Sequence, residues 1–294
     1  MTEPLTLIVN PHAGGGRARR SLPAVQASLR VGGAECETHF TENLGHAGEL
    51  ARGAAAAGRV AVAFGGDGLI GAVAGALRGT EGTLGVLPGG RGNDFARVLG
   101  LPAEPEAAAA ILLAGVPRPV DLGETAEGAA FVGIASCGFD SDANRIANQA
   151  TLVRGNLVYA YGALRALAAW KPASFVVTID DAPARRFTGY SVAAANSKAY
   201  GGGMLLAPDA SLEDGLLDVV ISSHIGKLRF LALLPTVFRG EHVNQPQVTV
   251  LRGRQVTISA DRPFTVYADG DPIAELPATI RAVPHAIRVL LPAP

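Results

Sequence analysis

An apolar run that ends in a glycine-rich loop with a single acid is the feature that most constrains this chain. Residues 59–63 lead into Phe64-Gly65-Gly66-Asp67-Gly68, which predicts a buried strand, a loop and then a helix over about 69–77. Glycine lets a backbone approach a polyanion closely, and a helix N-terminus adds partial positive charge. Asp67 fits there if it orients a sugar hydroxyl or holds a magnesium ion that phosphates share. The stretch therefore indicates nucleotide chemistry.

Two more loops of this kind follow short apolar runs. The run 5–9 leads into Asn10-Pro11-His12-Ala13-Gly14-Gly15-Gly16, and the run 84–87 leads into Pro88-Gly89-Gly90-Arg91-Gly92-Asn93-Asp94. In a doubly wound α/β sheet, loops at the carboxyl ends of neighbouring strands meet in one crevice. We therefore expect one shared site, in which Arg91 reaches a phosphate and Asn93 and Asp94 start a helix.

Gly66, Gly68 and Gly71 also satisfy the dinucleotide fingerprint G-x-G-x-x-G. That fingerprint belongs in the first strand–helix turn of its unit, and it needs an acid at the end of the next strand to hold a ribose. The corresponding region, residues 84–92, contains no acid, and the motif follows a later strand than the first. The sequence therefore argues against an NAD-dependent dehydrogenase.

Composition limits the partners and the compartment. The 294 residues carry a net charge of -1 and are 48% hydrophobic but only 5% aromatic, so we expect an aliphatic core and no nucleic-acid partner. Cys36 and Cys137 have no CxxC partner, which favours a reduced, cytoplasmic protein. No signal-peptide pattern is apparent, and the apolar segment 230–235 is too short to span a bilayer. A protein of this kind that acts on lipids would work peripherally, at the inner membrane surface.

The chain divides into two regions of different pattern. Residues 1–120 alternate strand-like and helical stretches, which predicts a Rossmann-like α/β domain with a parallel sheet that binds nucleotide. Residues 121–294 hold mainly short strand-like runs, with helices expected within 141–169 and over 227–238, which predicts an all-β, sandwich-like domain. Pro117 and Pro119 interrupt the first pattern, so we place the boundary near residue 120. A return of the extreme C-terminus to the first domain stays open, and a cleft is expected between the domains.

Two acid-containing turns supply chemistry in the second region. Asp214, with the carbonyls of Ser211 and Leu216, offers oxygen ligands that suit a hard cation, although an Asp-Gly hairpin turn alone explains the same spacing. Near the C-terminus, Asp269-Gly270-Asp271 closes a strand-like run. A carboxylate that faces the glycine loops across the cleft suits removal of a proton from an alcohol. An ordinary hairpin is the simpler interpretation of that loop taken singly.

Short motifs follow one another in a fixed order along essentially the whole chain. They are Asn10-Pro11 with the glycines to Gly16, Thr41 with Gly45-His46-Ala47, Gly65-Gly66-Asp67-Gly68, Gly92-Asn93-Asp94-Phe95-Ala96-Arg97, Tyr200-Gly201-Gly202-Gly203, Ala207-Pro208, Asp214-Gly215, Gly240 with His242, and Asp269-Gly270. By these motifs and their order, the chain resembles the diacylglycerol kinase catalytic-domain family. That family is related to sphingosine kinases and more distantly to NAD kinases.

The resemblance implies an NAD kinase/diacylglycerol kinase-like fold, ATP and Mg²⁺ in the cleft, and a lipid alcohol at a membrane surface as the acceptor. It implies Asp271 as the general base on the lipid hydroxyl, Asp67 as a second catalytic residue, and a structural Mg²⁺ held by Asp214 with the carbonyls of Ser211 and Leu216. Asp67, Asp94 and Asp121 would help to position the phosphates and their magnesium. The implied nucleotide-binding residues are Asn10, Pro11, Gly14, Thr41, Gly65, Gly66, Asp67, Gly68, Arg91, Gly92, Asn93 and Asp94.

Five positions depart from the residues usual in that family. Leu69 replaces Thr, Gly71 and Ala72 replace Asn and Glu, Arg91 replaces Thr or Ser, and Asp271 replaces Glu. We expect Arg91 to take over phosphate binding, since it brings a charge and a planar fork. The shorter side chain of Asp271 still accepts a proton if the cleft closes slightly further.

The expected function is that of an ATP-dependent lipid kinase, which phosphorylates the hydroxyl of diacylglycerol or a similar lipid alcohol. Two alternatives stay open. The lost Thr, Asn and Glu side chains favour a catalytically degenerate sensor that binds nucleotide or lipid. An NAD kinase would share the GGDG loop, but we find in this sequence no second acidic motif of the Asn-Glu kind that is typical of such enzymes.

The contact with lipid is the least constrained part of the sequence. Apolar side chains at roughly helical spacing, flanked by basic ones, occur at Leu228, Leu231, Ala232, Leu234 and Phe238, with Lys227, Arg229 and Arg239 around them. The pattern fits either an amphipathic helix packed on the sandwich or a helix that faces a membrane. Nothing in the sequence distinguishes diacylglycerol from a sphingoid base, phosphatidylglycerol or another lipid alcohol, and the oligomeric state is equally open.

Overall fold

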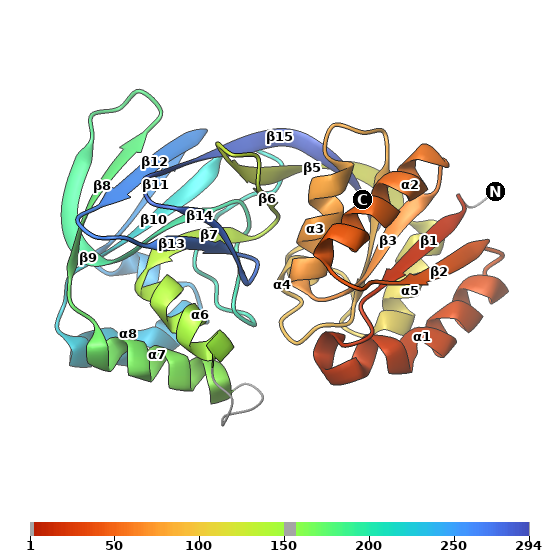
Figure 1. Cartoon of the computed structure of the whole chain (residues 1–294), viewed down its shortest axis with the longest axis horizontal. Helices are drawn as coiled ribbons and strands as arrows, with labels where there is room; N and C mark the ends of the chain where they lie inside the picture. Colours follow the sequence, from red (N-terminus) through yellow and green to blue (C-terminus); the bar gives the residue numbers. More distant parts are fainter. Residues whose placement is uncertain (1–2, 150–156, 294) are drawn as a thin grey trace.

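The computed structural model describes residues 3–149 and 157–293, which form two bodies side by side (Figure 1). The strands are β1 (Leu5–Val9), β2 (Cys36–Phe40), β3 (Val60–Gly65), β4 (Thr83–Pro88), β5 (Val116–Thr125), β6 (Ala130–Phe131), β7 (Ile134–Gly138), β8 (Ala173–Ile179), β9 (Arg185–Ala195), β10 (Leu217–Ser223), β11 (Val248–Gly253), β12 (Gln255–Ala260), β13 (Thr265–Ala268), β14 (Asp271–Glu275) and β15 (Ala278–Leu291). The helices are α1 (Ala13–Val31), α2 (Leu44–Ala56), α3 (Asp67–Leu77), α4 (Asp94–Val98), α5 (Pro105–Ala114), α6 (Phe139–Gln149), α7 (Leu157–Ala169), α8 (Lys227–Val237) and the 3₁₀ helix η1 (Glu241–Asn244).

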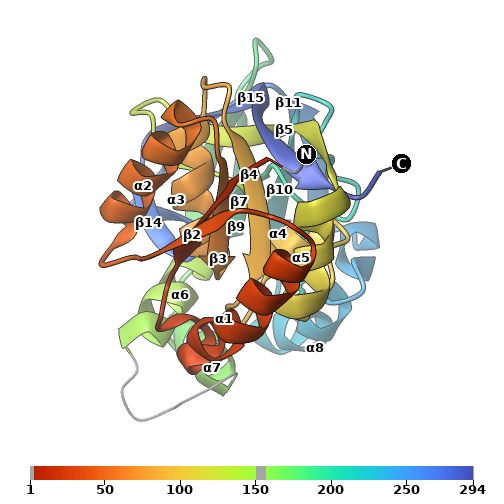
Figure 2. The same cartoon turned by 90° about the vertical axis from the view of Figure 1, so that its right-hand side faces the viewer.

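The N-terminal half is the expected α/β layer structure with a parallel sheet. Its strands lie in the order β2-β1-β3-β4, and each neighbouring pair is parallel. Helices α2 and α3 cover one face of the sheet, and α1 and α5 cover the other (Figure 2). Every residue of β1, β3 and β4 is buried. Parallel strands that are covered on both faces carry continuous apolar runs, and these runs are the signal by which the sequence predicted them.

The C-terminal half is the expected β sandwich. Its strands follow the order β14-β13-β7-β9-β8-β12, and β10 and β11 join at β9. The main core of this half contains Phe139, Trp170, Tyr190 and Phe264, with Phe230 of α8 packed against it. The aliphatic core expected for the whole chain is therefore found mainly around the parallel sheet, where Phe64 and Phe95 are among the buried residues, whereas aromatic side chains are concentrated in the sandwich core.

Strand β15 passes from one half to the other. Its first residues pair antiparallel with β12, and its last residues pair parallel with β4. Along most of its length it also pairs with β5. Residue 120, the expected domain boundary, lies within β5, which pairs with the strand that joins the two halves. The position of the domain boundary therefore stays a prediction. The shared pair of strands sets how the loops of one half face those of the other.

Pro117 and Pro119, which interrupt the alternating pattern in the sequence, both lie in β5, a strand that the sequence did not predict over these residues. They pair with Leu290 and Arg288 of β15, and the partner of β5 on its other side, β6, reaches only Gly123 and Glu124. Proline lacks the N–H that a second neighbouring strand would need, so an edge position tolerates it. Strand β14 and the first half of β15 were also not expected from the sequence.

Helices α6, α7 and α8 lie at one end of the sandwich (Figure 1). The helical stretch expected near 141–169, with breaks at unspecified positions, corresponds to α7 and to all of α6 except its first two residues. Residues 150–156 lie outside the described residues, so the breaks stay a prediction. Within the described part of the chain, no helix has the length and apolarity required to cross a bilayer.

Candidate active site

The three glycine loops meet at the carboxyl edge of the parallel sheet, backbone against backbone. The N–H of Gly89 donates to the carbonyl of Gly65 at 2.7 Å. A Cβ placed on Gly90 would lie 2.5 Å from the Cα of Gly66, and one on Gly14 would lie 2.5 Å from the carbonyl oxygen of Gly89. Because no side chain fits at these contacts, the glycines are what allows the loops after β1, β3 and β4 to converge as expected.

Thr41 and Arg91 belong to the same edge but differ in how they are held. The N–H of Thr41 donates to the carbonyl of Val9 at 2.9 Å, so Thr41 is fixed beside the end of β1, where Asn10 and Pro11 follow. Arg91 is exposed, and its guanidinium has no ion pair or hydrogen bond within the described residues. Its charge is therefore available to an anion.

Asn93 closes its own loop rather than capping the helix that follows it. Helix α4 starts at Asp94 as expected, and Asn93 occupies the N-cap position with a left-handed φ of 52° and no side-chain cap. Its side chain instead accepts a hydrogen bond from the N–H of Gly90 at 2.8 Å and donates to the Gly90 carbonyl at 3.1 Å. Asn tolerates this backbone conformation better than most residues.

Asp67 begins α3 and keeps one carboxylate oxygen turned toward the loops. Its Oδ1 accepts a hydrogen bond from the N–H of Phe95 at 3.0 Å, and its Oδ2 lies 3.2 Å from where a Cβ of Gly92 would be. Burial raises the pKa of the Asp67 carboxyl, and the negative charge of Asp94 adds to that rise. The arrangement leaves Oδ2 for a hydroxyl or a cation.

Asp94 connects the two halves of the molecule. It is buried, its Oδ2 accepts a hydrogen bond from the N–H of Gly202 at 2.7 Å, and its Oδ1 forms a close ion pair with Arg97. Gly202 belongs to the Tyr200-Gly201-Gly202-Gly203 motif. Two motifs that are far apart in the sequence are thus joined through one carboxylate.

The Asp269-Gly270 segment is the two-residue turn of a β-hairpin between β13 and β14, as the simpler interpretation had it. Both turn residues have positive φ, 53° and 98°, which is the type I′ geometry that Asp-Gly favours. The side chain of Asp269 also forms hydrogen bonds outside the turn. The Asp269 carboxylate accepts hydrogen bonds from the N–H groups of Val132 at 2.8 Å and Gly133 at 3.0 Å.

The hairpin acids lie against the first turns of α3, directly after the GGDG loop. A Cβ on Gly68 would lie 3.3 Å from Oδ2 of Asp271, and one on Gly71 would lie 3.0 Å from Oδ2 of Asp269. Burial raises the pKa of Asp269 to about 7, and the charges of Asp67 and Asp271 add to it. Asp271 is more exposed, and partial burial raises its pKa as well. The structure therefore gathers three carboxylates, Asp67, Asp269 and Asp271, at one place between the halves.

Asp121 lies in the interior and holds two segments of the second half. Its carboxylate accepts hydrogen bonds from the N–H of Gly215 and from the N–H of His285, each at 2.7 Å, and its side chain is fully buried. Both oxygens are thus used by protein groups. Asp121 fixes the turn that contains Asp214.

The turn around Asp214 offers oxygen ligands only. Asp214 Oδ1 accepts a hydrogen bond from the N–H of Leu216 at 3.0 Å, and Ser211 Oγ accepts one from the N–H of Glu213 at 3.2 Å. The second carboxylate oxygen and the two carbonyls are a donor set that suits Mg²⁺. In the described residues, no three His, Cys, Asp or Glu side chains are grouped as metal ligands, so a cation here would depend on carbonyls.

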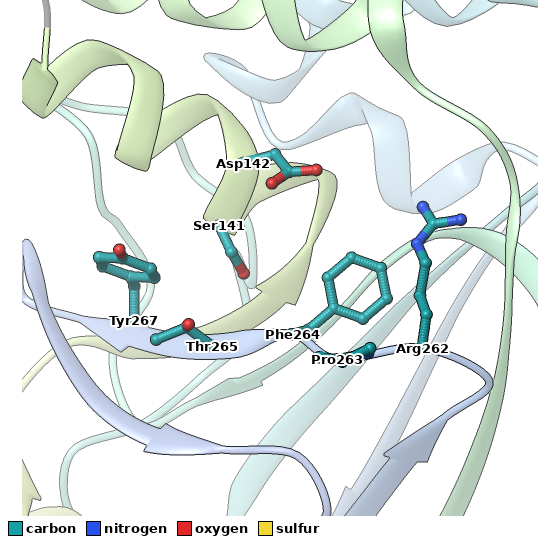
Figure 3. Close-up of a pocket in the computed structure, with 7 residues that line it drawn as sticks. All are labelled: Ser141, Asp142, Arg262, Pro263, Phe264, Thr265 and Tyr267. Atoms are coloured by element: carbon teal, nitrogen blue, oxygen red, sulfur yellow. The ribbon is translucent and has the colours of Figure 1, made fainter.

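A cavity of about 310 Å³ opens beside β13 (Figure 3). Residues of α6 and of the segment that leads into the hairpin line it from two sides. They are Ser141, Asp142, Arg262, Pro263, Phe264, Thr265 and Tyr267. The sequence did not mark these residues, because no local motif joins a helix start to a strand that lies more than a hundred residues later. Its last member, Tyr267, lies two residues before Asp269.

Comparison with known proteins gives the family. A family model described as the diacylglycerol kinase catalytic domain matches residues 4–125. A second, described as the YegS C-terminal NAD kinase beta sandwich-like domain, matches residues 133–291. A diacylglycerol kinase of Mycobacterium tuberculosis is 34% identical over an alignment of 294 positions, which covers 98% of this chain and 95% of that protein. The chain belongs to the diacylglycerol kinase catalytic-domain family. The family expected from the motifs is therefore confirmed.

Solved structures agree with this family's fold. A diacylglycerol kinase crystal structure from Bacillus anthracis matches with a TM-score of 0.78 at 22% identity and covers 98% of this chain and 97% of that chain. An NAD kinase from Archaeoglobus fulgidus in complex with ATP matches with a TM-score of 0.54 at 14% identity, over 97% of this chain and 92% of that one. At these identities the likeness shows the fold, which is the NAD kinase/diacylglycerol kinase-like fold expected from the sequence.

Proposed function

We propose that this protein is an ATP-dependent lipid kinase that phosphorylates the hydroxyl of diacylglycerol or a similar lipid alcohol at the inner membrane surface. The observation that carries the proposal is the position of Asp271. This carboxylate comes from the β-rich half, yet it lies against Gly68 of the GGDG loop. An acceptor hydroxyl held between the halves would meet a base on one side and the nucleotide loops on the other.

The nucleotide would lie over the converging glycine loops. Backbone N–H groups after β1, β3 and β4 and the N-terminus of α3 suit phosphate oxygens, and the exposed guanidinium of Arg91 suits one phosphate. Thr41, Asn10, Pro11 and the loop glycines form the walls of this site. Asp67 keeps Oδ2 for a ribose hydroxyl or for the Mg²⁺ that accompanies ATP.

Phosphoryl transfer at this site needs one proton acceptor. Asp271 takes the proton of the lipid hydroxyl. The oxygen of that hydroxyl forms a bond to the γ-phosphorus, while the bond from the γ-phosphorus to the oxygen of the departing ADP breaks. A pKa above the ordinary value makes Asp271 a better base than a free carboxylate. When bound, Mg²⁺ neutralises phosphate charge, and Asp214 with the Ser211 and Leu216 carbonyls would hold a second, structural ion.

The cavity beside β13 supports an acceptor that enters from the sandwich side. Its polar lining, with hydroxyl groups from Ser141, Thr265 and Tyr267, suits a lipid headgroup better than an acyl chain. The strand that lines it continues into the turn that carries Asp269 and Asp271. An acceptor bound there would reach the base along β13.

The proposal is tested by ADP release from Mg²⁺-ATP in mixed micelles that contain diacylglycerol, a sphingoid base or phosphatidylglycerol, with NAD as a soluble acceptor. ADP release that requires one of the lipids is the expected result. ATP binding by calorimetry without ADP release for any acceptor contradicts the kinase and favours the degenerate sensor. ADP release that requires NAD instead identifies an NAD kinase.

Substitution of Asp271 tests the base directly. Asp271→Ala is expected to lower turnover about 100-fold or more, the usual contribution of a general base, without a change in ATP affinity. Asp271→Glu is expected to retain turnover. Asp181→Asn, at an exposed acid in the loop between β8 and β9, is the control. Undiminished turnover of Asp271→Ala would remove Asp271 from the mechanism.

A further inference from the structure

Helix α8 is apolar on both of its faces. Residues three and four apart share a face of a helix, which divides α8 and its C-cap residue Phe238 into two sets. The inner face consists of Phe230, Leu233, Leu234 and Val237. The outer face consists of Leu228, Leu231, Ala232, Pro235 and Phe238. A helix that is apolar all round normally has apolar surroundings on every side.

Within the described residues, only the inner face has such surroundings. Phe230 stacks on Tyr190 with ring centroids 4.0 Å apart, whereas no residue of α8 is fully buried. On the outer face Leu228 is 86% exposed, Leu231 39% and Phe238 55%. Packing on the sandwich, one of the two interpretations left open by the sequence, thus describes the inner face. The outer face has no comparable packing among the described residues, and the membrane-facing interpretation stays a prediction for it.

The charges on α8 are all positive. Lys227 and Arg229 lie in its first turn, Arg239 follows its end, and the helix contains no acidic residue. Positive charge in the first turn opposes the helix dipole, so the stability of the helix does not explain these two residues. Lys227 donates to the carbonyl of Ala168 at 2.8 Å, and the side chain of Arg229 has no hydrogen bond or ion pair among the described residues.

We propose that the outer face of α8 docks on an anionic lipid bilayer, with Leu228, Leu231 and Phe238 in the interface and Arg229 at the headgroups. Exposed apolar side chains beside basic ones, on a helix without acids, complement the apolar boundary and negative potential of such a surface. The proposal deepens the lipid kinase function, on which its purpose rests. Binding to a bilayer can be measured without any catalysis.

The docking face is tied to the cavity beside β13 by aromatic contacts. Phe230 of α8 meets Phe139 with ring centroids 4.9 Å apart, and Phe139 starts α6, which supplies Ser141 and Asp142 to the cavity. On the opposite wall, the guanidinium of Arg262 lies 5.0 Å from the ring centroid of Trp170, directly after α7. A bilayer bound at α8 would therefore be held in a fixed relation to the cavity.

Sedimentation of the full chain with vesicles tests the apolar part of the proposal. Leu228→Glu is expected to weaken binding to vesicles of one part phosphatidylglycerol and three parts phosphatidylcholine about ten-fold or more. This is the loss expected when a leucine side chain is no longer transferred from water into the bilayer interface. Val31→Glu is the matched control, since Val31 is 90% exposed at the end of α1 in the other half. Equal effects of the two substitutions, or no binding by the unaltered chain, would overturn the proposal.

Arg229→Gln tests the electrostatic part. The expected loss is about five-fold on vesicles with phosphatidylglycerol, as for one basic residue near an anionic surface, and none on pure phosphatidylcholine. Arg30→Gln, an exposed arginine at the far end of α1, should leave both unchanged. Equal loss on both kinds of vesicle would contradict an anionic partner.

Two further readouts separate docking from its alternatives. If the outer face instead binds a second copy of the chain, sedimentation equilibrium without lipid will show a dimer that Leu228→Glu disrupts, and the proposal fails. If docking serves catalysis, Leu228→Glu loses turnover on vesicles but keeps turnover with a short-chain diacylglycerol below its micelle concentration. Vesicle binding without turnover on either acceptor would contradict the proposed kinase activity but would still support docking at the outer face of α8.

Discussion

Gly71 of α3 leaves the space that the carboxylate of Asp269 occupies: a Cβ at Gly71 would lie 3.0 Å from Asp269 Oδ2. The two residues belong to different halves of the molecule. By the resemblance described above, Gly71 is also expected to stand where the family usually has Asn. The missing side chain at Gly71 is therefore matched by the Asp269 carboxylate of the opposite hairpin, which fills the space. The absence of a longer side chain at Gly71 does not by itself indicate that the catalytic site is lost.

Gly71→Ala is expected to displace Asp269 and to lower lipid-dependent ADP release. In an exposed helix interior the same change stabilises a protein by about 0.5–1 kcal/mol, as we expect for Gly53→Ala in α2, where nothing lies within 4 Å of the added Cβ. At Gly71 the contact with Asp269 should cancel that gain. Urea unfolding and turnover of both variants check this. A stabilised, fully active Gly71→Ala variant would show that the contact has no functional role.

Arg91→Ala is expected to weaken ATP binding about ten-fold or more, the size of a lost hydrogen bond to a charged group, with little change in stability because the side chain is exposed. Arg91→Lys should recover only part of the affinity, since an ammonium lacks the planar fork. Calorimetric titration with ATP measures both, and Arg30→Ala serves as the control. Unaltered affinity of Arg91→Ala would remove this residue from the nucleotide site.

Asp269 should make stability fall as the pH rises. Its pKa is raised from 3.8 to about 7 in the folded chain, chiefly by burial, so folding favours the protonated form. Its stabilising contribution is full below about pH 4 and is lost as the pH rises through about 7. The free energy of unfolding in urea should therefore fall more steeply between pH 5 and pH 8 for the unaltered chain than for Asp269→Asn. Parallel slopes would contradict the raised pKa.

Asp121→Ala is expected to destabilise the fold by about 2–4 kcal/mol, because the N–H groups of Gly215 and His285 would lose their acceptors. Thermal unfolding of this variant beside Asp181→Ala measures the effect. Both substitutions remove one negative charge, but Asp181 is exposed. A similar melting temperature for the two variants would show that Asp121 does not hold the turn around Asp214.

Local patterns were enough to predict much of the fold. Strands β1, β3 and β4 are covered on both faces, so their sequences are unbroken apolar runs that stand out without any alignment. The glycine loops that follow them were equally visible, because close backbone approach requires glycine wherever it occurs. Strand β5 was missed because its prolines indicate an interruption, and only the edge position beside β15 makes them acceptable.

The site required more than these patterns. The sequence singled out Asp67, Asp94 and Asp271, but Asp94 meets Gly202 across 108 residues of chain, and the Asp269 turn meets α3 across a greater separation. Local propensity carries no information about such contacts, since either hairpin acid would fit an isolated turn equally well. The sequence by itself determined the glycine loops and the family. The tertiary structure decided which carboxylates lie together, because β5 and β15 join the two halves. It also decided which face of α8 is exposed, because Phe230 packs on Tyr190 within the sandwich.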